Sequence, residues 1–469
     1  MPLTRPRPRV HVIGFDLVTE REMMTVENGT TAPAAPKPIR YAHLLALSVL
    51  VGAVGGLLAA LYYAMMQGGI RLIWEWALPA MANHMPYAVA LIGLMALGGL
   101  LVGLATRRMG RPGEISAVVD NIHMKHGQID SRATPAMVVI SLVSIVFGGS
   151  AGPEAPLVQI IGSLASRLGM RLSADHVRTL TFCGMSAALG AFFGAPLGGA
   201  LFALEIPHRR GLEYYEALVP SILAALSAFW VFRGIVGYDG AIYHLSGAVT
   251  VDSKTMLYGL LLGALGAGIG SVFMLLFRGV GHITKRLESS PVWLALAGGI
   301  ILAVIALLCP ATTGTTSLFW GEHQIVEMIS HSDSMTELMT RQAILPLLAL
   351  AALKMFAITI TLHCGYRGGF IFPLFFVGAA CGLALSYGTH GAVSPAIAVL
   401  CLMAAVNVAV TKTPISTAVI LSTLSGTAVL PVIAAACFTS FVLTTRMNLI
   451  KTQRERGHAG VEPSSCGQG

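Results

Sequence analysis

A single acidic side chain, Glu154, interrupts the otherwise uncharged segment 133–166 directly after a glycine-rich break. Gly152 permits a sharp turn, and Pro153 and Pro156 are tolerated in the first turn of a helix because a backbone N–H there has no partner in any case. The free N–H groups and the positive end of the helix dipole favour an anionic group at such a place. The pattern therefore predicts a helix start that either carries or binds a negative charge.

The same break occurs again in the second half of the chain. Residues 365–378 read GYRGGFIFPLFFVG, and one shift places Gly152 on Gly369 and Pro156 on Pro373. Two further segments, MSAALGAFFGAP and MAAVNVAVTKTP, align from end to end at nearly the same shift. A membrane chain with related halves and helices broken at matching places usually has its binding site where the breaks meet.

The second copy of the break has no acid, because Ile371 stands in its place. Its backbone N–H groups, at Phe370, Ile371 and Phe372, are therefore expected to lack an anionic partner. Two such helix starts directed at one point would form a neutral, preorganised anion site.

Two interpretations of Glu154 remain open at this point. Its carboxylate either caps its own helix or competes with a permeant anion for the same N–H groups. Bare burial of a small ion costs on the order of 20 kcal/mol, so protein groups must replace its water. Neither GPEAP nor GGFIFP contains Lys or Arg, and partial charges of backbone dipoles let an anion both enter and leave.

The amino-acid composition indicates whether these motifs lie in water or in a membrane. The 469 residues are 55% hydrophobic and only 11% charged, with a mean hydropathy of +0.74, whereas soluble proteins carry about 25% charged residues. Several runs without Asp, Glu, Lys or Arg exceed the length of about 20 residues that one span needs. The chain is therefore predicted to be an all-α integral membrane protein. Its net charge of +8 gathers at chain ends and loops, which places both termini in the cytoplasm, with the protein in the cell inner membrane.

One membrane domain is predicted over 40–455, with related halves at about 40–236 and 250–445. Polar tails are expected at 1–39, as a disordered cytoplasmic segment, and at 456–469. Polar connections are expected at 107–132 and 312–340, and a short basic helix is expected after the last apolar one. Apolar helices are expected near 41–67, 86–106, 133–148, 154–168, 175–191, 194–206, 214–234, 252–285, 290–310, 342–364, 371–385, 393–408, 413–423 and 428–444.

Other polar residues give weaker signals. Glu205 is expected at a helix end near the cytoplasmic interface, paired with Arg209 or Arg210 rather than relaying protons. Lys412 is expected to anchor the interface, the alternative being that it binds backbone carbonyls. The seven cysteines have no metal-ligand spacing, and no Walker or HExxH motif is present. No enzyme activity, metal or cofactor is therefore predicted.

These segments resemble the chloride channel (CLC) family. GPEAP followed by LVQIIGSLAS is similar to its first gate motif, and GGFIFP is similar to its GxFxP motif; FGAPLGGALFALE and LPVIAAACFTSF also look like family segments. The resemblance implies two inverted repeats of tilted and broken helices and a homodimer with a separate anion pathway in each subunit. It makes Glu154 the external gating glutamate. It also implies a bacterial-type member without regulatory CBS domains.

Several positions depart from the family pattern. The family serine of GSGIP falls on Gly110 or Arg111, the pathway tyrosine falls nearest to Asn448, and the internal proton-transfer glutamate falls on Ile206. The anion-binding residues expected from the motifs are Gly152, Ala155, Phe370, Ile371, Phe372 and either Gly110 or Arg111.

Three functions are compatible with these residues. Because the internal proton acceptor is missing, passive permeation of chloride or related anions, gated by Glu154, is the first expectation. Proton-coupled exchange of chloride or fluoride is the alternative, and a non-conducting membrane scaffold of the same fold is the third. The expected partners are a small anion, the lipid bilayer, a second copy of the chain and, for the exchanger, protons; nucleic acid is not expected.

Overall fold

The computed structural model describes the residues 40–113, 115–172, 174–208, 212, 215–237, 243, 251–285, 290–333, 337–426, 428–450 and 453. Residues Met1–Lys37 and Pro38–Gly469 form separate units, and all described residues belong to the second unit. The predicted tails 1–39 and 456–469 lie outside the described residues, as do Arg209 and Arg210.

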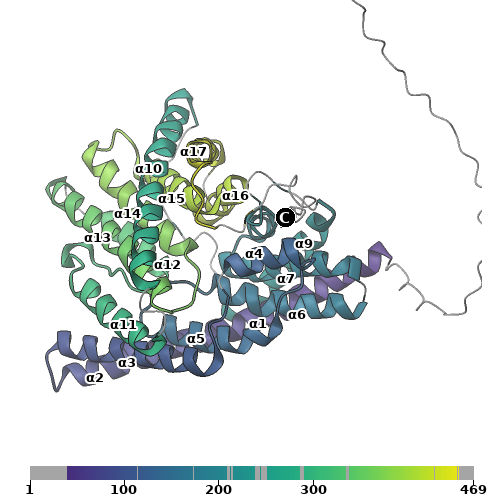
Figure 1. Ribbon diagram of the computed structural model, residues 1–469. Coiled ribbons are helices and arrows are strands. Elements are labelled where there is room, and N and C mark those ends of the chain that lie inside the picture. The colour runs from purple at the N-terminus through teal and green to yellow at the C-terminus, as the bar shows by residue number, and fades with distance from the viewer. Residues whose placement is uncertain are drawn as a thin grey trace, which may run out of the picture. The chain divides into compact units, whose positions relative to one another are not determined.

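The regular structure of the described residues is helical (Figure 1). The first half contains α1 (Tyr41–Ile70), a π-helical turn (Arg71–Ala77), α2 (Leu78–Ala82), α3 (Tyr87–Met109), α4 (Ile115–Met124), α5 (Thr134–Val146), α6 (Glu154–Leu172), α7 (Ala174–Phe193), α8 (Pro196–Glu205) and α9 (Leu218–Val236). The second half contains α10 (Ser253–Thr284), α11 (Pro291–Leu307), α12 (Glu322–Asp333), α13 (Glu337–His363), α14 (Ile371–Gly388), α15 (Pro395–Thr411), α16 (Pro414–Ser425) and α17 (Leu430–Thr444).

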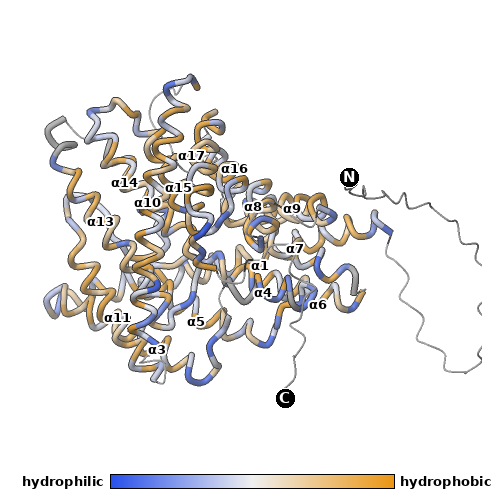
Figure 2. Tube along the Cα trace, turned by 45° about the horizontal axis from the view of Figure 1, so that its top comes forward, coloured by the Kyte–Doolittle hydropathy of each residue, from blue (hydrophilic) through white to orange (hydrophobic). Residues whose placement is uncertain are grey.

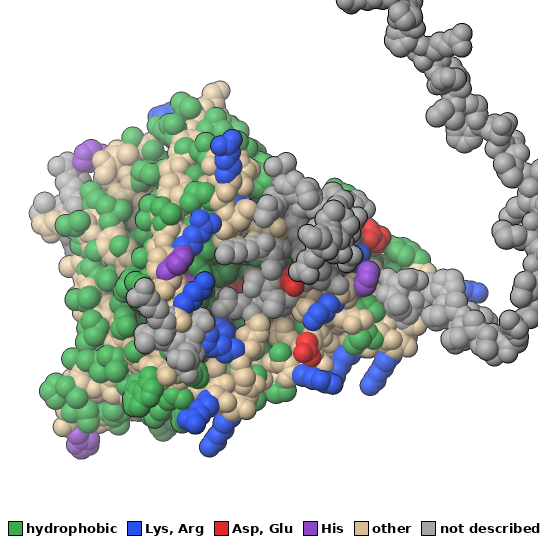
Figure 3. All heavy atoms as spheres, viewed as in Figure 1, with side chains coloured by type: hydrophobic (Ala, Val, Ile, Leu, Met, Phe, Trp, Pro, Cys, Tyr) green, Lys and Arg blue, Asp and Glu red, His purple; other side chains and the backbone are tan. Residues whose placement is uncertain are grey.

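Six helical stretches in the described part of the chain have the length and apolar composition to cross a membrane. They are Tyr41–Ala82, Tyr87–Met109, Tyr215–Val236, Ser253–Thr284, Gln342–His363 and Ile371–Gly388. Apolar residues recur along α10 and α13 (Figure 2), and hydrophobic side chains cover much of the surface on the left of Figure 3, over α11 and α13. A hydrophobic surface of this kind is stable in contact with lipid and does not need to be buried inside the protein.

The predicted apolar helices and the predicted breaks between them are confirmed, with ends that shift by a few residues. Each of the two polar connections contains a helix that the sequence did not indicate, α4 within 107–132 and α12 within 312–340. Both helices are short and carry charged residues, so neither has the long apolar run that identifies a span in the sequence. The basic helix expected after α17 is absent from the described residues 445–450.

Glycine brings α14 and α15 into direct backbone contact. A Cβ on Gly378 would overlap the backbone of Met403, and a Cβ on Gly382 would overlap that of Val399. The residue numbers of the two helices run in opposite directions along this contact, so the helices are antiparallel. Without a hydrophobic drive between helices in lipid, such close approach supplies the packing energy.

Candidate functional site

The two glycine-rich breaks meet in the structure. The N–H of Gly152 donates to the carbonyl of Gly369 at 2.8 Å, and the N–H of Gly369 donates to the carbonyl of Gly152 at 2.6 Å. The two glycines form an isolated antiparallel bridge. Antiparallel pairing of equivalent residues is what two inverted halves produce, and it brings the N-termini of α6 and α14 to one place.

Each break is supported by a hydroxyl from the opposite half. Thr361 of α13 accepts the N–H of Ser150, ahead of α6, at 3.0 Å. Ser144 of α5 accepts the N–H of Arg367, ahead of α14, also at 3.0 Å. These reciprocal bonds fix both turns, and no pattern in the sequence indicated them.

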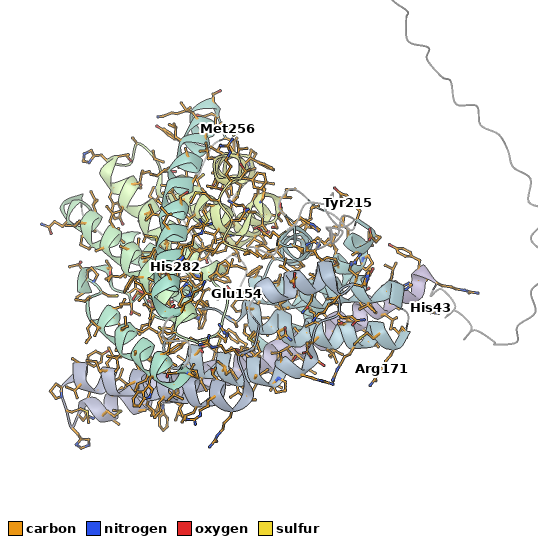
Figure 4. The ribbon with its side chains drawn as sticks, viewed as in Figure 1. His43, Glu154, Arg171, Tyr215, Met256 and His282 are labelled. Carbon is orange, nitrogen blue, oxygen red and sulfur yellow. The ribbon has the colours of Figure 1, made fainter. Side chains whose placement is uncertain are left out.

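Glu154 lies between the two helix starts and is fully buried. Its Oε1 accepts a hydrogen bond of 3.2 Å from the N–H of Phe372 in α14, while its Oε2 has no hydrogen-bond partner among the described residues. The carboxylate lies against Gly152 and Gly369, where a Cβ would collide with it. Figure 4 places Glu154 amid the helices, whereas the labelled Arg171 lies at a helix end. Because its hydrogen bond crosses to the other half, the geometry favours the second interpretation, a carboxylate in the position of an anion.

Aromatic rings cluster around Phe372, whose amide holds this carboxylate. The ring of Phe372 lies edge-on to that of Phe192, with centroids 5.4 Å apart, and 5.7 Å from that of Phe193. Phe193 in turn contacts Phe202 of α8 at 5.9 Å. Apolar rings exclude water, so the charges and dipoles of the helix starts act at low dielectric. The sequence motifs had indicated only the amides of this region.

The other predicted anion-binding residues divide into two groups. Gly152, Ala155, Phe370 and Ile371 are all buried at the two helix starts. Gly110 and Arg111 instead lie exposed, where the chain leaves α3 and Gly110 takes a φ of +82°. The role of both groups as anion ligands stays a prediction.

Glu205 lies at a helix end, as expected, and it is buried; its expected pairing with Arg209 or Arg210 lies outside the described residues. It ends α8 fully buried; its Oε1 accepts the N–H of Ile415 at 3.0 Å, and its Oε2 accepts the N–H and hydroxyl of Ser416 at 2.9 and 2.6 Å. A second carboxylate of the first half thus caps a helix start of the second half, that of α16. Three donors hold Glu205 and one holds Glu154, so Glu154 is the less firmly held of the two carboxylates.

Lys412 binds carbonyls, and its expected role as an interface anchor was wrong. It lies buried at the α15–α16 break with a φ of +64°. Its Nζ donates to the carbonyl of Ala409 at 2.7 Å and to the carbonyl and hydroxyl of Thr444 at 2.6 and 2.7 Å. Lys412 therefore ties α15 to the end of α17.

The proton-pathway position of the resemblance, Ile206, follows α8 and is buried. Its carbonyl accepts the Nε2 of Gln453 at 2.8 Å, and the same nitrogen donates to the carbonyl of Thr411 at 2.8 Å. Asn448, the nearest match to the family tyrosine, is half-buried, and its carbonyl accepts the Nη2 of Arg278 at 2.7 Å. No group of metal-binding side chains occurs among the described residues.

Fold and site together define an integral membrane protein that holds a buried carboxylate between two opposed helix starts. The family model described as "Voltage gated chloride channel" matches residues 98–445, which is most of the chain. The chain belongs to this CLC family of anion transport proteins, which are not enzymes.

Individual relatives agree with this assignment. A "Chloride/fluoride channel protein" of Pseudomonas syringae pv. tomato is 27% identical over 425 residues, covering 89% of this chain and 87% of the relative. A solved CLC-type fluoride/proton antiporter has a TM-score of 0.73 at 22% identity, covering 89% of this chain and 100% of the other. A slow cyanobacterial Cl⁻/H⁺ antiporter has a TM-score of 0.72 at 20% identity, covering 86% and 94%. At these identities the two structures establish the fold alone.

Proposed function

We propose that the protein exchanges protons for a small halide, chloride or fluoride, with Glu154 as both gate and proton carrier. The observation that carries the proposal is the position of its carboxylate, buried between two helix starts and held by one amide of the opposite half. The named activities of the relatives, a chloride/fluoride channel and two proton antiporters, support the same class of substrates.

Proton and anion binding are linked in this proposal because the Glu154 carboxylate and the anion compete for the same position. A negative carboxylate satisfies the amide of Phe372 and repels an anion; a protonated one carries no charge and loses most of this attraction. An anion therefore binds when Glu154 has left, and Glu154 leaves more readily when it is protonated. Binding of the two ions is then thermodynamically coupled, as reciprocal linkage requires.

The test uses purified protein in liposomes that carry a pH gradient and no membrane potential. Coupled exchange drives chloride or fluoride uphill and shifts the reversal potential away from the value set by the anion alone. Anion movement that only dissipates its own gradient, without proton flux, contradicts exchange. A complete lack of flux, with no effect of Glu154→Gln, would identify a non-conducting scaffold.

Passive permeation is the second candidate, and Ile206 favours it. This buried aliphatic side chain stands where the resemblance places the inner proton acceptor, and it can neither bind nor release a proton. In the same liposomes, passive permeation predicts anion flux that is insensitive to the direction of the pH gradient.

The remaining features of the proposal come from the family resemblance. The anion ligands are the helix-start residues Gly152, Ala155, Phe370, Ile371 and Phe372, with Gly110 or Arg111 at the replaced serine. The protein acts as a homodimer in the cell inner membrane, with both termini in the cytoplasm.

A further inference from the structure

A closed ring of buried polar side chains lies at the break between α15 and α16. The Nδ2 of Asn407 donates to the hydroxyl of Thr417 at 3.0 Å. The hydroxyls of Thr417 and Thr413 are 3.2 Å apart, and those of Thr413 and Thr411 are 2.7 Å apart. The Thr411 hydroxyl donates to the backbone carbonyl of Asn407 at 2.9 Å. All four residues are fully buried.

The direction of every bond in the ring is determined, because a hydroxyl has one hydrogen. Thr411 donates to the carbonyl of Asn407, so Thr413 must donate to Thr411 and Thr417 must donate to Thr413. This leaves the Oδ1 of Asn407, which has no hydrogen-bond partner among the described residues. A buried amide with one end unpaired is costly, so this end is suited to a ligand.

The unpaired amide lies on the face of α15 that contacts α14. Val399 and Met403 contact α14 at Gly382 and Gly378. Asn407 follows Met403 by four residues and therefore lies on the same face, about one turn further on.

Because α14 and α15 are antiparallel, this turn leads toward the N-terminus of α14. There the amide of Phe372 holds Glu154. Helix geometry therefore puts Asn407 about one turn beyond Gly378, toward the end of α14 at which Glu154 is held.

From this geometry we infer that Asn407 is the anion ligand that substitutes for the serine and tyrosine missing from this chain. Half a rotation of the amide exchanges its ends. The Thr417 hydroxyl then donates to Oδ1, and Nδ2 offers an N–H to a small monovalent anion. The rotation gives up two bonds, from Nδ2 to Thr417 and from Thr417 to Thr413, and gains the one from Thr417 to Oδ1. The ligand is neutral, and the rotation is reversible. The inference depends on the proposed anion transport but not on proton coupling.

The test measures chloride and fluoride binding by calorimetry in a Glu154→Gln parent, whose gate carries no charge. Asn407→Leu removes the amide at similar volume, and Asn407→Ser restores a short donor. Thr359→Val is the matched control, because the buried Thr359 hydroxyl bonds only the carbonyl of Met355 in its own helix at 2.8 Å. Hydrogen bonds to a charged partner are strong enough that the loss of one corresponds to about tenfold or more in affinity.

We expect Asn407→Leu to weaken binding of at least one halide about tenfold, Asn407→Ser to weaken it less, and Thr359→Val to leave it unchanged. Binding within about twofold of the parent in Asn407→Leu overturns the inference, since this is well below the effect of one charged hydrogen bond. If that variant does not fold, Thr417→Val removes the hydroxyl that supports the rotated amide; unchanged binding there overturns the inference equally. Normal halide binding in a wild-type protein that moves no protons refutes exchange alone and leaves the Asn407 result valid.

Discussion

Two buried carboxylates of the same half cap helix starts of the other half, and they differ in how firmly they are held. Glu205 has three donors at 2.6–3.0 Å, whereas Glu154 has one at 3.2 Å. Several short bonds to a carboxylate fix both its position and its charge. A single long bond allows exchange with another anion. At the scale of the residue, the number of hydrogen bonds therefore separates the structural acid from the proposed gate.

The gate assignment predicts the effect of a neutral gate. Glu154→Gln lacks the negative charge that competes with the anion, so anion flux should rise and lose its stimulation by acid. Flux measured in liposomes at neutral and acidic pH checks both effects. Glu205→Gln is the matched control; persistence of the wild-type acid response in Glu154→Gln would refute the gate.

The structural role of Glu205 predicts a loss of stability. Glu205→Ala leaves two buried N–H groups and a hydroxyl without their acceptor, which should lower the free energy of unfolding by about 1–3 kcal/mol or more. Glu154→Ala removes only one long bond and should cost less. Thermal unfolding of both variants in the same detergent provides the comparison. An equal or smaller effect of Glu205→Ala would contradict the assigned role.

At the scale of the element, the position of the site depends on where helices begin and on which helices are in direct contact. The breaks before α6 and α14 expose free amides, and the reciprocal bonds of Ser144 and Thr361 hold both turns. The close approach of α14 and α15 then sets the level at which the polar ring of α15 lies. Displacing either helix should therefore affect anion binding without changing a ligand.

This dependence can be tested at Gly378. Gly378→Val places side-chain atoms against the backbone of Met403 and should force α14 and α15 apart, at a cost of about 1–3 kcal/mol in stability. Anion flux should fall with it. Gly388→Val is the control, because a Cβ on this last residue of α14 meets no atom within 4 Å. Similar flux and melting temperature in the two variants would show that the contact is not required.

At the scale of the whole molecule, the site lies within one chain. The amide of Phe372, the carboxylate of Glu154 and the ring around Asn407 all belong to the same subunit. The proposed homodimer of such subunits would therefore have one complete pathway in each subunit.

Independent pathways predict additive behaviour of mixed dimers. Co-expression of differently tagged wild-type and Glu154→Gln subunits, followed by tandem purification, yields dimers with one altered gate. Their flux should lie midway between those of the two parents, and only the share contributed by the wild-type subunit should keep its acid dependence. Light scattering in detergent checks the dimer mass; a monomeric mass, or a mixed dimer that behaves like either parent, would contradict this arrangement.

The sequence by itself determined the membrane class, most helices, the matching breaks and Glu154, because these depend on local composition and on glycine and proline. It could not reveal α4 and α12, which lack long apolar runs. Only the tertiary structure decided that Glu205 and Lys412 are buried and that Asn407 has an unpaired amide end, since each has partners on other helices. The partner of a side chain depends on how helices pack, and local sequence patterns do not reveal contacts between residues far apart in the chain.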